Sequence, residues 1–297
     1  QVKRLAERQA RWSTMPPPLA AWALIQPGWR KAVHYGTLPW DAAGMDVVEW
    51  LVGKDLRQFL AEAFGRRWCL GRSPTPRVRF SVEDFLQLLK DFDPGLARAV
   101  HFQKMERYGL GRTPVLTPDW ADGPLKFWSA SMCRLLDGAY EDIQEEERIA
   151  EFLSQRDLST AEDLRDTGDN WSFVLNQVHG ASPALQGLHS ALWALLRVSG
   201  SVNAYLTPPL ATAKVPHVDD HDVFVLQQHG EKRWFLLADD MSSPLQEVTL
   251  TPGDVLYVPQ GLPHCARSVS DEPSLHLAVS VSRPALTGAG LLAACLE

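Results

Sequence analysis

The hydrophobic pattern changes in character along the chain. Apolar residues in 76–198 recur every three or four positions, as in the run after Ser81 and in the Leu-rich run that Ser182 and Pro183 introduce. From residue 199 to 283 the apolar runs become short, rich in Val, Leu and Phe, and separated by turn residues. The pattern therefore predicts helices first and then a compact series of strands.

The strand region carries its own turn signals. Two apolar runs, 223–228 and 232–237, flank Gly230 and predict a hairpin. Further strands are expected at 247–250, 255–258 and 274–282, and a β-like segment at 171–179. Many short strands at such spacing are typical of a β-barrel or jelly roll.

These patterns divide the chain into four parts. A Pro- and Trp-rich N-terminal extension, 1–75, is expected to pack on the core. A mainly helical region, 76–198, leads into the barrel core at 199–283, and residues 284–297 begin a C-terminal helix or tail. The predicted fold class is α+β, a jelly-roll barrel with a mainly helical N-terminal surround.

Composition narrows the function classes. The net charge of -7 argues against a broad nucleic-acid surface, which needs clustered Lys and Arg. The 4 cysteines form no CxxC pair, so we do not expect a zinc site built on cysteine. We expect the thiols to be reduced and the protein to be cytoplasmic. Neither a membrane-spanning apolar run nor the apolar core of a signal peptide is recognisable in the sequence.

One set of polar residues in the strand region suggests chemistry. His217 and Asp219 lie two positions apart, where strand geometry points both side chains the same way, and His264 follows a Gly-Pro turn at the start of a later strand. Two imidazoles and one carboxylate leave open coordination positions, as in the non-haem iron(II) oxygenases. The alternative is that both histidines are surface residues or hydrogen-bonded core residues. The PGDVLYVPQGLPH stretch at the expected distance favours the metal site.

The local motifs resemble a known family. The stretch SVNAYLTPPLATAKVPHVDDHDVFVLQQHGEKRWFLL and the later LTPGDVLYVPQGLPHCARS are similar to the core of JmjC-type oxygenases, in particular the ribosomal-oxygenase branch. The similarity covers roughly 55–283 and is densest over 170–283. It implies a cupin-type double-stranded β-helix, iron(II) and 2-oxoglutarate as cofactors, dioxygen, and a protein or peptide substrate. It leaves a homodimer open.

The resemblance also implies roles for individual residues. It assigns iron to His217, Asp219 and His264, and it places Lys232 against the distal carboxylate of 2-oxoglutarate. A buried dicarboxylate needs such a cation, because its desolvation is otherwise uncompensated. The neighbouring Arg233 should point the opposite way. The alternative for Lys232 is an ordinary lysine on the strand surface.

Further candidates share strand faces with these residues. By resemblance, Asn203 and Tyr205 line the cosubstrate site, and His276 and Ser280 on the last strand face the barrel interior; core packing is the alternative for Tyr205, His276 and Ser280. After the HVD motif, Asp220 and Asp222 should be rim residues, whereas His221 should face inward near the ligands or the substrate.

The resulting functional hypothesis is hydroxylation of an amino-acid side chain in a protein or peptide, either a ribosomal protein or the precursor of a peptide natural product. Three alternatives remain open at this level. They are a metal cupin enzyme that needs no cosubstrate, a JmjC demethylase, and a cupin-like binding protein without catalysis. The first usually holds its metal with three histidines and one carboxylate, which the HxD pattern and Lys232 disfavour.

Overall fold

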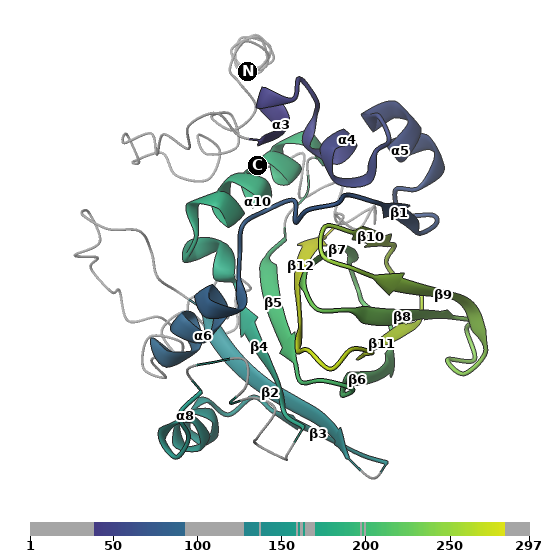
Figure 1. Cartoon of the computed structure of the whole chain (residues 1–297). Helices are drawn as coiled ribbons and strands as arrows, with labels where there is room; N and C mark the ends of the chain where they lie inside the picture. Colours follow the sequence, from purple (N-terminus) through teal and green to yellow (C-terminus); the bar gives the residue numbers. More distant parts are fainter. Residues whose placement is uncertain are drawn as a thin grey trace, which may run out of the picture.

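Two antiparallel sheets dominate the computed structural model, which describes residues 39–92, 128–136, 138–158, 160, 163, 170–196, 198 and 200–282 (Figure 1). One sheet has 8 strands in the order β1-β10-β7-β12-β5-β4-β2-β3, and the other has 4 in the order β6-β11-β8-β9. The strands are β1 (Cys69–Gly71), β2 (Ser129–Leu136), β3 (Ala139–Ile143), β4 (Ser172–Asn176), β5 (Val202–Thr207), β6 (Thr212–His217), β7 (Asp222–His229), β8 (Lys232–Leu237), β9 (Pro244–Leu250), β10 (Val255–Val258), β11 (His264–Ser268) and β12 (Ser274–Val281).

The hairpin predicted around Gly230 is wrong. β7 and β8 follow each other in the chain but enter different sheets: β7 pairs with β10 and β12, whereas β8 pairs with β11 and β9. Gly230 has a φ of 60° at this crossing, and a Cβ there would lie 2.3 Å from the carbonyl oxygen of Pro273. The glycine therefore permits a close backbone approach as the chain passes from one sheet to the other.

Helices cover one side of the larger sheet (Figure 1). They are α3 (Pro39–Ala42), α4 (Val47–Val52), α5 (Leu56–Glu62), α6 (Val82–Lys90), α8 (Glu146–Ser154) and α10 (Pro183–Leu196), with a 3-10 turn, η2, at Val178–Gly180. The helix start expected at Ser81 is confirmed, because the Ser81 hydroxyl and the Asp84 carboxylate form a reciprocal capping box. No described helix has the length and apolarity needed to cross a membrane.

The region 76–198 is less helical than its sequence predicts. Its described part holds β2 and β3 as well as β4, which lies within the β-like segment expected at 171–179. The three strands extend the larger sheet beyond β5. In the N-terminal extension, β1 adds to the opposite edge through pairing with β10. The residues 1–38, 93–127 and 283–297, and with them the expected C-terminal helix, lie outside the described residues.

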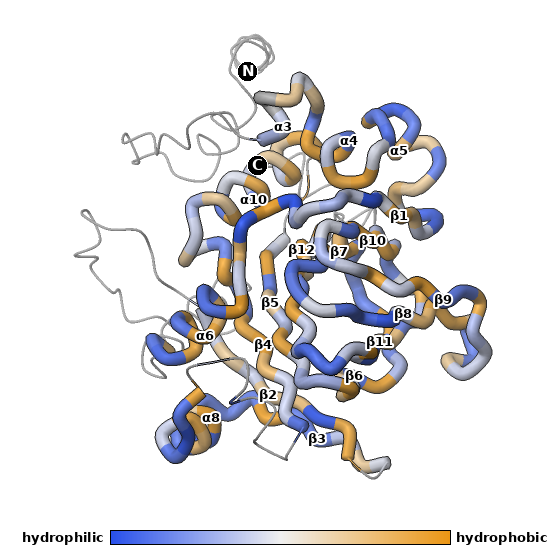
Figure 2. The backbone as a smooth tube through the Cα atoms, viewed as in Figure 1, coloured by the Kyte–Doolittle hydropathy of each residue, from blue (hydrophilic) through white to orange (hydrophobic). Residues whose placement is uncertain are grey.

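Side-chain alternation divides the interior into two layers. In β7, Phe224 and Leu226 join the large core beneath the helices, whereas Val223 and Val225 face the space between the two sheets. Hydrophobic residues recur along β4 and β5, between the helices and the barrel (Figure 2). A strand that is buried on both faces needs a continuous apolar run, which β7 has. The space between the sheets is apolar at one end, and the other end holds polar side chains.

Candidate active site

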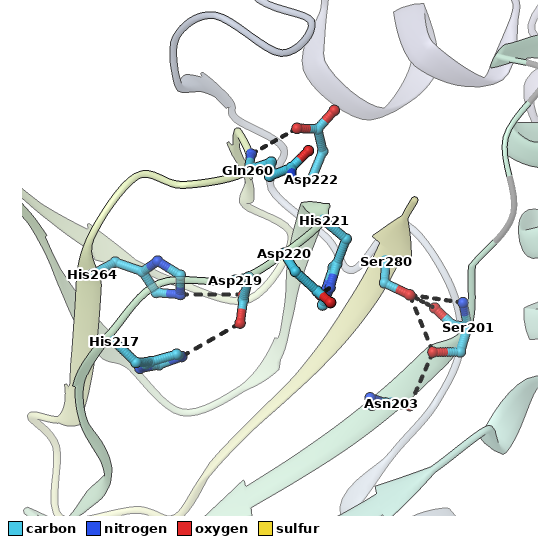
Figure 3. Close-up of polar contacts among 10 residues, drawn as sticks. All are labelled: Ser201, Asn203, His217, Asp219, Asp220, His221, Asp222, Gln260, His264 and Ser280. Carbon is cyan, nitrogen blue, oxygen red and sulfur yellow. Dashed lines mark hydrogen bonds and ion pairs between the residues drawn. The ribbon is translucent and has the colours of Figure 1, made fainter. Parts of the chain in front are cut away.

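The three predicted ligands converge at the open end of the barrel (Figure 3). His217 ends β6 and His264 begins β11, and the two residues are opposite each other in the antiparallel pair. Asp219 follows β6, with its carboxylate oxygens 3.8 Å from Nε2 of His217 and 3.5 Å from Nε2 of His264. One ligand atom from each residue lies within 4.8 Å of the others. The strand register thus brings His264 next to the other two candidate ligands. The separation of 45 residues between Asp219 and His264 in the sequence does not by itself predict this proximity.

Backbone carbonyls orient both imidazoles. Nδ1 of His217 lies 2.8 Å from the oxygen of Val215, and Nδ1 of His264 lies 2.9 Å from the oxygen of Leu262. An Nδ1–H that donates to such a carbonyl leaves the lone pair on Nε2, the atom that faces Asp219. Burial also lowers the pKa of His264, which keeps the ring neutral at neutral pH. Two imidazole nitrogens and one carboxylate are donors that suit a divalent iron ion.

A cavity of ≈ 260 Å³ extends from these ligands into the barrel. Lys232 reaches it from β8 and is only 1% exposed. Its ammonium donates to the hydroxyl of Thr207 at 2.8 Å and lies 3.5 Å from Nδ1 of His276. Burial lowers the pKa of Lys232 to about 7, and no carboxylate among the described residues pairs with it. A buried cation of this kind is suited to an anionic ligand.

Aromatic rings form the walls between the lysine and the ligands. Tyr205 stacks on His276 with ring centroids 4.8 Å apart and an interplanar angle of 9°. Trp234 contacts both His264 and His276, at centroid distances of 5.8 and 5.5 Å. Burial raises the pKa of Tyr205 and lowers that of His276, so both rings are uncharged at neutral pH. The walls therefore leave Lys232 as the charged group at this end.

The remaining candidates meet on neighbouring strands. Asn203 lines the cavity from β5, and its side-chain oxygen accepts from the backbone N–H of Gln177 at 3.1 Å. Ser280 lines the cavity from β12, and its hydroxyl accepts from the N–H of Ser201 at 2.8 Å. The bond between Ser280 and Ser201 ties β12 to the start of β5 (Figure 3), and the bond between Asn203 and Gln177 ties β5 to the segment that follows β4. The contacts of Asn203 and Ser280 with a cosubstrate stay a prediction.

One residue that follows the HVD motif differs from expectation. Asp222 is not a rim residue: it is 0% exposed, and its carboxylate accepts from the N–H of Gln260 at 2.7 Å. The carbonyl of Asp219 accepts from Gly261 N–H at 3.0 Å. These two bonds tie the loop before His264 to the loop that carries Asp219 and to the start of β7. Alternation from Asp219 misplaced Asp222 because the chain between them is a loop, not a strand.

The other two residues lie closer to expectation. Asp220 is exposed, and one of its carboxylate oxygens lies 2.9 Å from Nδ1 of His221. His221 lines the cavity.

Sequence reasoning missed two polar residues that also belong to the site. Thr207 lies two positions beyond Tyr205 on the same face of β5, a signal that could have identified it. Lys214 on β6 lines the cavity with no motif to mark it.

Comparison with known proteins places this site in a family. The family described as "JmjC domain" matches residues 186–288, which include all three candidate ligands and Lys232. Residues 186–288 are thus similar to a JmjC domain. Its N-terminal boundary falls within α10, and its sheet strands β5 to β12 form the double-stranded β-helix.

Relatives of this region carry oxygenase names. The chain is 39% identical over 97 residues to the "bifunctional lysine-specific demethylase and histidyl-hydroxylase NO66" of Culex quinquefasciatus, covering 27% of this chain and 15% of that protein. It is 33% identical over 135 residues to "ribosomal oxygenase 1" of Gallus gallus, covering 37% of this chain and 22% of that protein. The chain thus matches less than a quarter of the length of these relatives. The predicted resemblance to ribosomal-oxygenase-like JmjC proteins is confirmed.

A solved structure shows the same fold. YcfD, a ribosomal oxygenase from Escherichia coli, aligns over 82% of this chain and 54% of its own with a TM-score of 0.53 and 17% sequence identity. YcfD in complex with cobalt and 2-oxoglutarate aligns with a TM-score of 0.52. At this identity the likeness concerns the fold. It confirms the prediction of a cupin-type barrel preceded by a region with helices.

Proposed function

We propose that this chain is an iron(II)- and 2-oxoglutarate-dependent oxygenase that hydroxylates a side chain in a protein or peptide. The observation that carries the proposal is the arrangement within one cavity. A His-Asp-His cluster lies at its open end, and a buried lysine without a carboxylate partner among the described residues lines it further in. The names of the relatives, and a YcfD structure with cobalt and 2-oxoglutarate, support the same chemistry.

Each part of the cavity has a role in this proposal. Iron would be held by Nε2 of His217, Nε2 of His264 and the carboxylate of Asp219, and Lys232 with Thr207 would bind the distal carboxylate of 2-oxoglutarate. With both cofactors bound, one oxygen atom of dioxygen enters a substrate C–H bond as hydroxyl, while the other enters succinate as carbon dioxide leaves.

The protein's own contribution is position and shielding. The carbonyls of Val215 and Leu262 hold the ligand imidazoles in one tautomer, which keeps both lone pairs directed at the same point. The stacked Tyr205 and His276 and the indole of Trp234 exclude water around the ammonium of Lys232. An ion pair formed in such surroundings is stronger than one in water.

A metal cupin enzyme without a cosubstrate is less well supported. Such a site usually needs a third histidine, whereas the cluster found among the described residues has two histidines and one aspartate. It would also leave Lys232 buried without a ligand. The choice between hydroxylation and demethylation concerns the substrate, because both use the same cofactor site. The name of the Culex quinquefasciatus relative includes both activities. Hydroxylation is preferred here because the local motifs resemble the ribosomal-oxygenase branch, to which the Gallus gallus relative and the structural neighbour belong by name.

Anaerobic titration tests the cofactor proposal. Iron(II) is added to the protein with and without 2-oxoglutarate, and the weak visible charge-transfer band of the chelate is recorded. We expect the band only with both ligands, and we expect His264→Ala and Lys232→Ala to abolish it at the same concentrations. Arg233→Ala is the matched control, because Arg233 is the next residue on β8 and is absent from the cavity lining. Tight iron binding with no band in the wild type would refute the role of 2-oxoglutarate.

A further inference from the structure

A second lysine lies where two cavities meet. Lys214, on β6 three positions before His217, lines the ≈ 260 Å³ cavity, here called the inner chamber. It also lines a neighbouring cavity of ≈ 350 Å³, the outer chamber. The two chambers have further lining residues in common, namely Asn176, Asn203 and Tyr205. Lys214 therefore stands at the wall through which a group in the outer chamber would approach the iron ligands.

Lys214 lacks a partner of its own. Among the described residues its ammonium makes no hydrogen bond or ion pair, and the contact found for it is with the ring of Tyr205, 5.9 Å from the ring centroid. Tyr205 is the largest cause that raises the pKa of Lys214. Burial opposes it, and Cys133, Asp219 and Asp142 raise the pKa further. The side chain is therefore charged at neutral pH and is available to a ligand.

Charge balance separates the two lysines. The inner chamber is lined by two cationic side chains, Lys214 and Lys232, and by one anionic one, Asp219. On the proposed function, on which this step rests, iron(II) and 2-oxoglutarate add charges that cancel, and Lys232 is taken by the distal carboxylate. One positive charge remains, at Lys214. A partly desolvated charge of this kind favours a group of opposite sign and disfavours one of like sign.

The outer chamber is suited to a polar residue of a peptide. Its walls carry hydroxyl and amide groups, including those of Ser129, Ser131 and Gln177, and it has acidic residues that the inner chamber lacks. Those acids, Asp142 and Glu146, come from β3 and the start of α8. Carboxylates in that position can accept hydrogen bonds from the N–H groups of a peptide main chain. Lys214 lies on the wall that the two chambers share, whereas Asp142 and Glu146 line the outer chamber alone.

We propose that Lys214 selects the substrate side chain, and that the group it binds is a carboxylate of an aspartate or glutamate residue in a peptide. Lys214 is thus a specificity residue for the proposed oxygenase. The same charge works against an arginine or lysine side chain at this position. A charge-assisted hydrogen bond on the favoured side, against repulsion on the other, predicts at least a tenfold difference in affinity.

The test measures peptide binding to the loaded protein. Four labelled pentapeptide pools, with Asp, Asn, His or Arg at the centre and mixed flanking residues, are titrated by fluorescence anisotropy. The protein carries Mn(II) and 2-oxoglutarate, so that no turnover occurs. Lys214→Met keeps the length of the side chain without its charge, and Lys214→Glu inverts the charge. Arg267→Glu is the matched control for Lys214→Glu, because the two substitutions change the net charge equally. Arg267 is exposed on the neighbouring strand β11.

We expect the wild type and Arg267→Glu to bind the Asp pool at least tenfold more tightly than the Arg pool. Lys214→Met should bind both pools alike, and Lys214→Glu should prefer the Arg pool. An unchanged preference in both Lys214 variants, or no binding of the Asp pool by the wild type, would overturn the proposal. So would a large loss of 2-oxoglutarate affinity in Lys214→Met, which would make Lys214 part of the cosubstrate site.

The iron and 2-oxoglutarate band distinguishes this result from a failure of the proposed function. A wild-type protein that forms the band but shows no acidic preference keeps the oxygenase proposal and loses the role of Lys214. A protein without the band loses both. The Lys214→Met variant should form the band as the wild type does, which also shows that the variant is folded around its ligands.

Discussion

Removal of the Lys232 charge should make the protein without cofactors more stable and abolish cosubstrate binding. An ammonium that is 1% exposed has a pKa of about 7 in place of its ordinary 10.5. The unfolded chain therefore binds more protons than the folded one between these values. The lowered pKa of Lys232 therefore reduces the free energy of unfolding by about 4 kcal/mol at pH 7 and by about 2 kcal/mol at pH 9. Lys232→Met removes this cost, but it also removes the hydrogen bond to Thr207, worth about 1 kcal/mol.

Urea denaturation of the metal-free protein measures the first effect. We expect the free energy of unfolding of Lys232→Met to exceed that of the wild type by about 3 kcal/mol at pH 7 and by about 1 kcal/mol at pH 9. The sign follows from the direction of the pKa change. A group with a lowered pKa in the folded state is protonated more readily on unfolding, so its unfavourable effect grows as the pH falls from 10.5 towards 7. Arg233→Met, the neighbour on β8, is the control and should show no such pH dependence.

The second effect is lost affinity for 2-oxoglutarate. A buried carboxylate left without its cation costs about 3 to 5 kcal/mol, which is at least a hundredfold in the dissociation constant. Calorimetric titration at pH 7 should show this loss in Lys232→Met. The prediction fails if Lys232→Met is no more stable than the wild type and if the difference in unfolding free energy is the same at pH 7 and pH 9. The fold would then not bury a cation here for its ligand.

Three further predictions concern residues outside the ligand set. Burial lowers the pKa of His179 to about 3, and the neighbouring His189 adds to this effect. The free energy of unfolding should therefore be greatest above pH 6.5 and fall by about 2 kcal/mol between pH 6.5 and pH 5. A free energy of unfolding that stays constant in this window, measured by chemical denaturation, would contradict the prediction. Asp222→Asn should weaken iron binding about tenfold, because the loop before His264 loses its charged anchor, whereas the exposed Asp220→Asn should leave the iron titration unchanged; equal effects of the two changes would argue against the anchor. Gly230→Ala should destabilise the protein by about 2 to 4 kcal/mol in a thermal melting experiment, because the added Cβ would meet the carbonyl of Pro273. Gly261→Ala is the control and should cost about 1 kcal/mol, because Gly261 also has a positive φ but has open space around it.

Local sequence determined the elements and much of the chemistry. Strand alternation in β12 placed His276 and Ser280 on one face, and the structure shows both lining the cavity. The capping residues of α6 and the start of α10 at Pro183 followed from propensities that act over a few residues. The HVD motif indicated two of the candidate ligands, because residues two positions apart on a strand point the same way. Lys232 was indicated by the family resemblance.

Long-range pairing was beyond such patterns. The apolar runs of β7 and β8 are the same whether the two strands form a hairpin or cross between sheets, so they left the partners of both strands undecided. The barrel places β8 against β11 and β9, and this arrangement brings Lys232 beneath Tyr205 and His276. The burial of Asp222 depends on a loop 38 residues away in the chain.

The sequence by itself indicated the candidate ligands His217, Asp219 and His264, since residue type and spacing are local properties. The tertiary structure decided which of them share one space. Thr207 joins Lys232, and Lys214 joins the wall of two cavities, because packing of the two sheets brings β5, β6 and β8 around the same interior. Those contacts are made between distant segments, and their energies depend on the whole arrangement of strands.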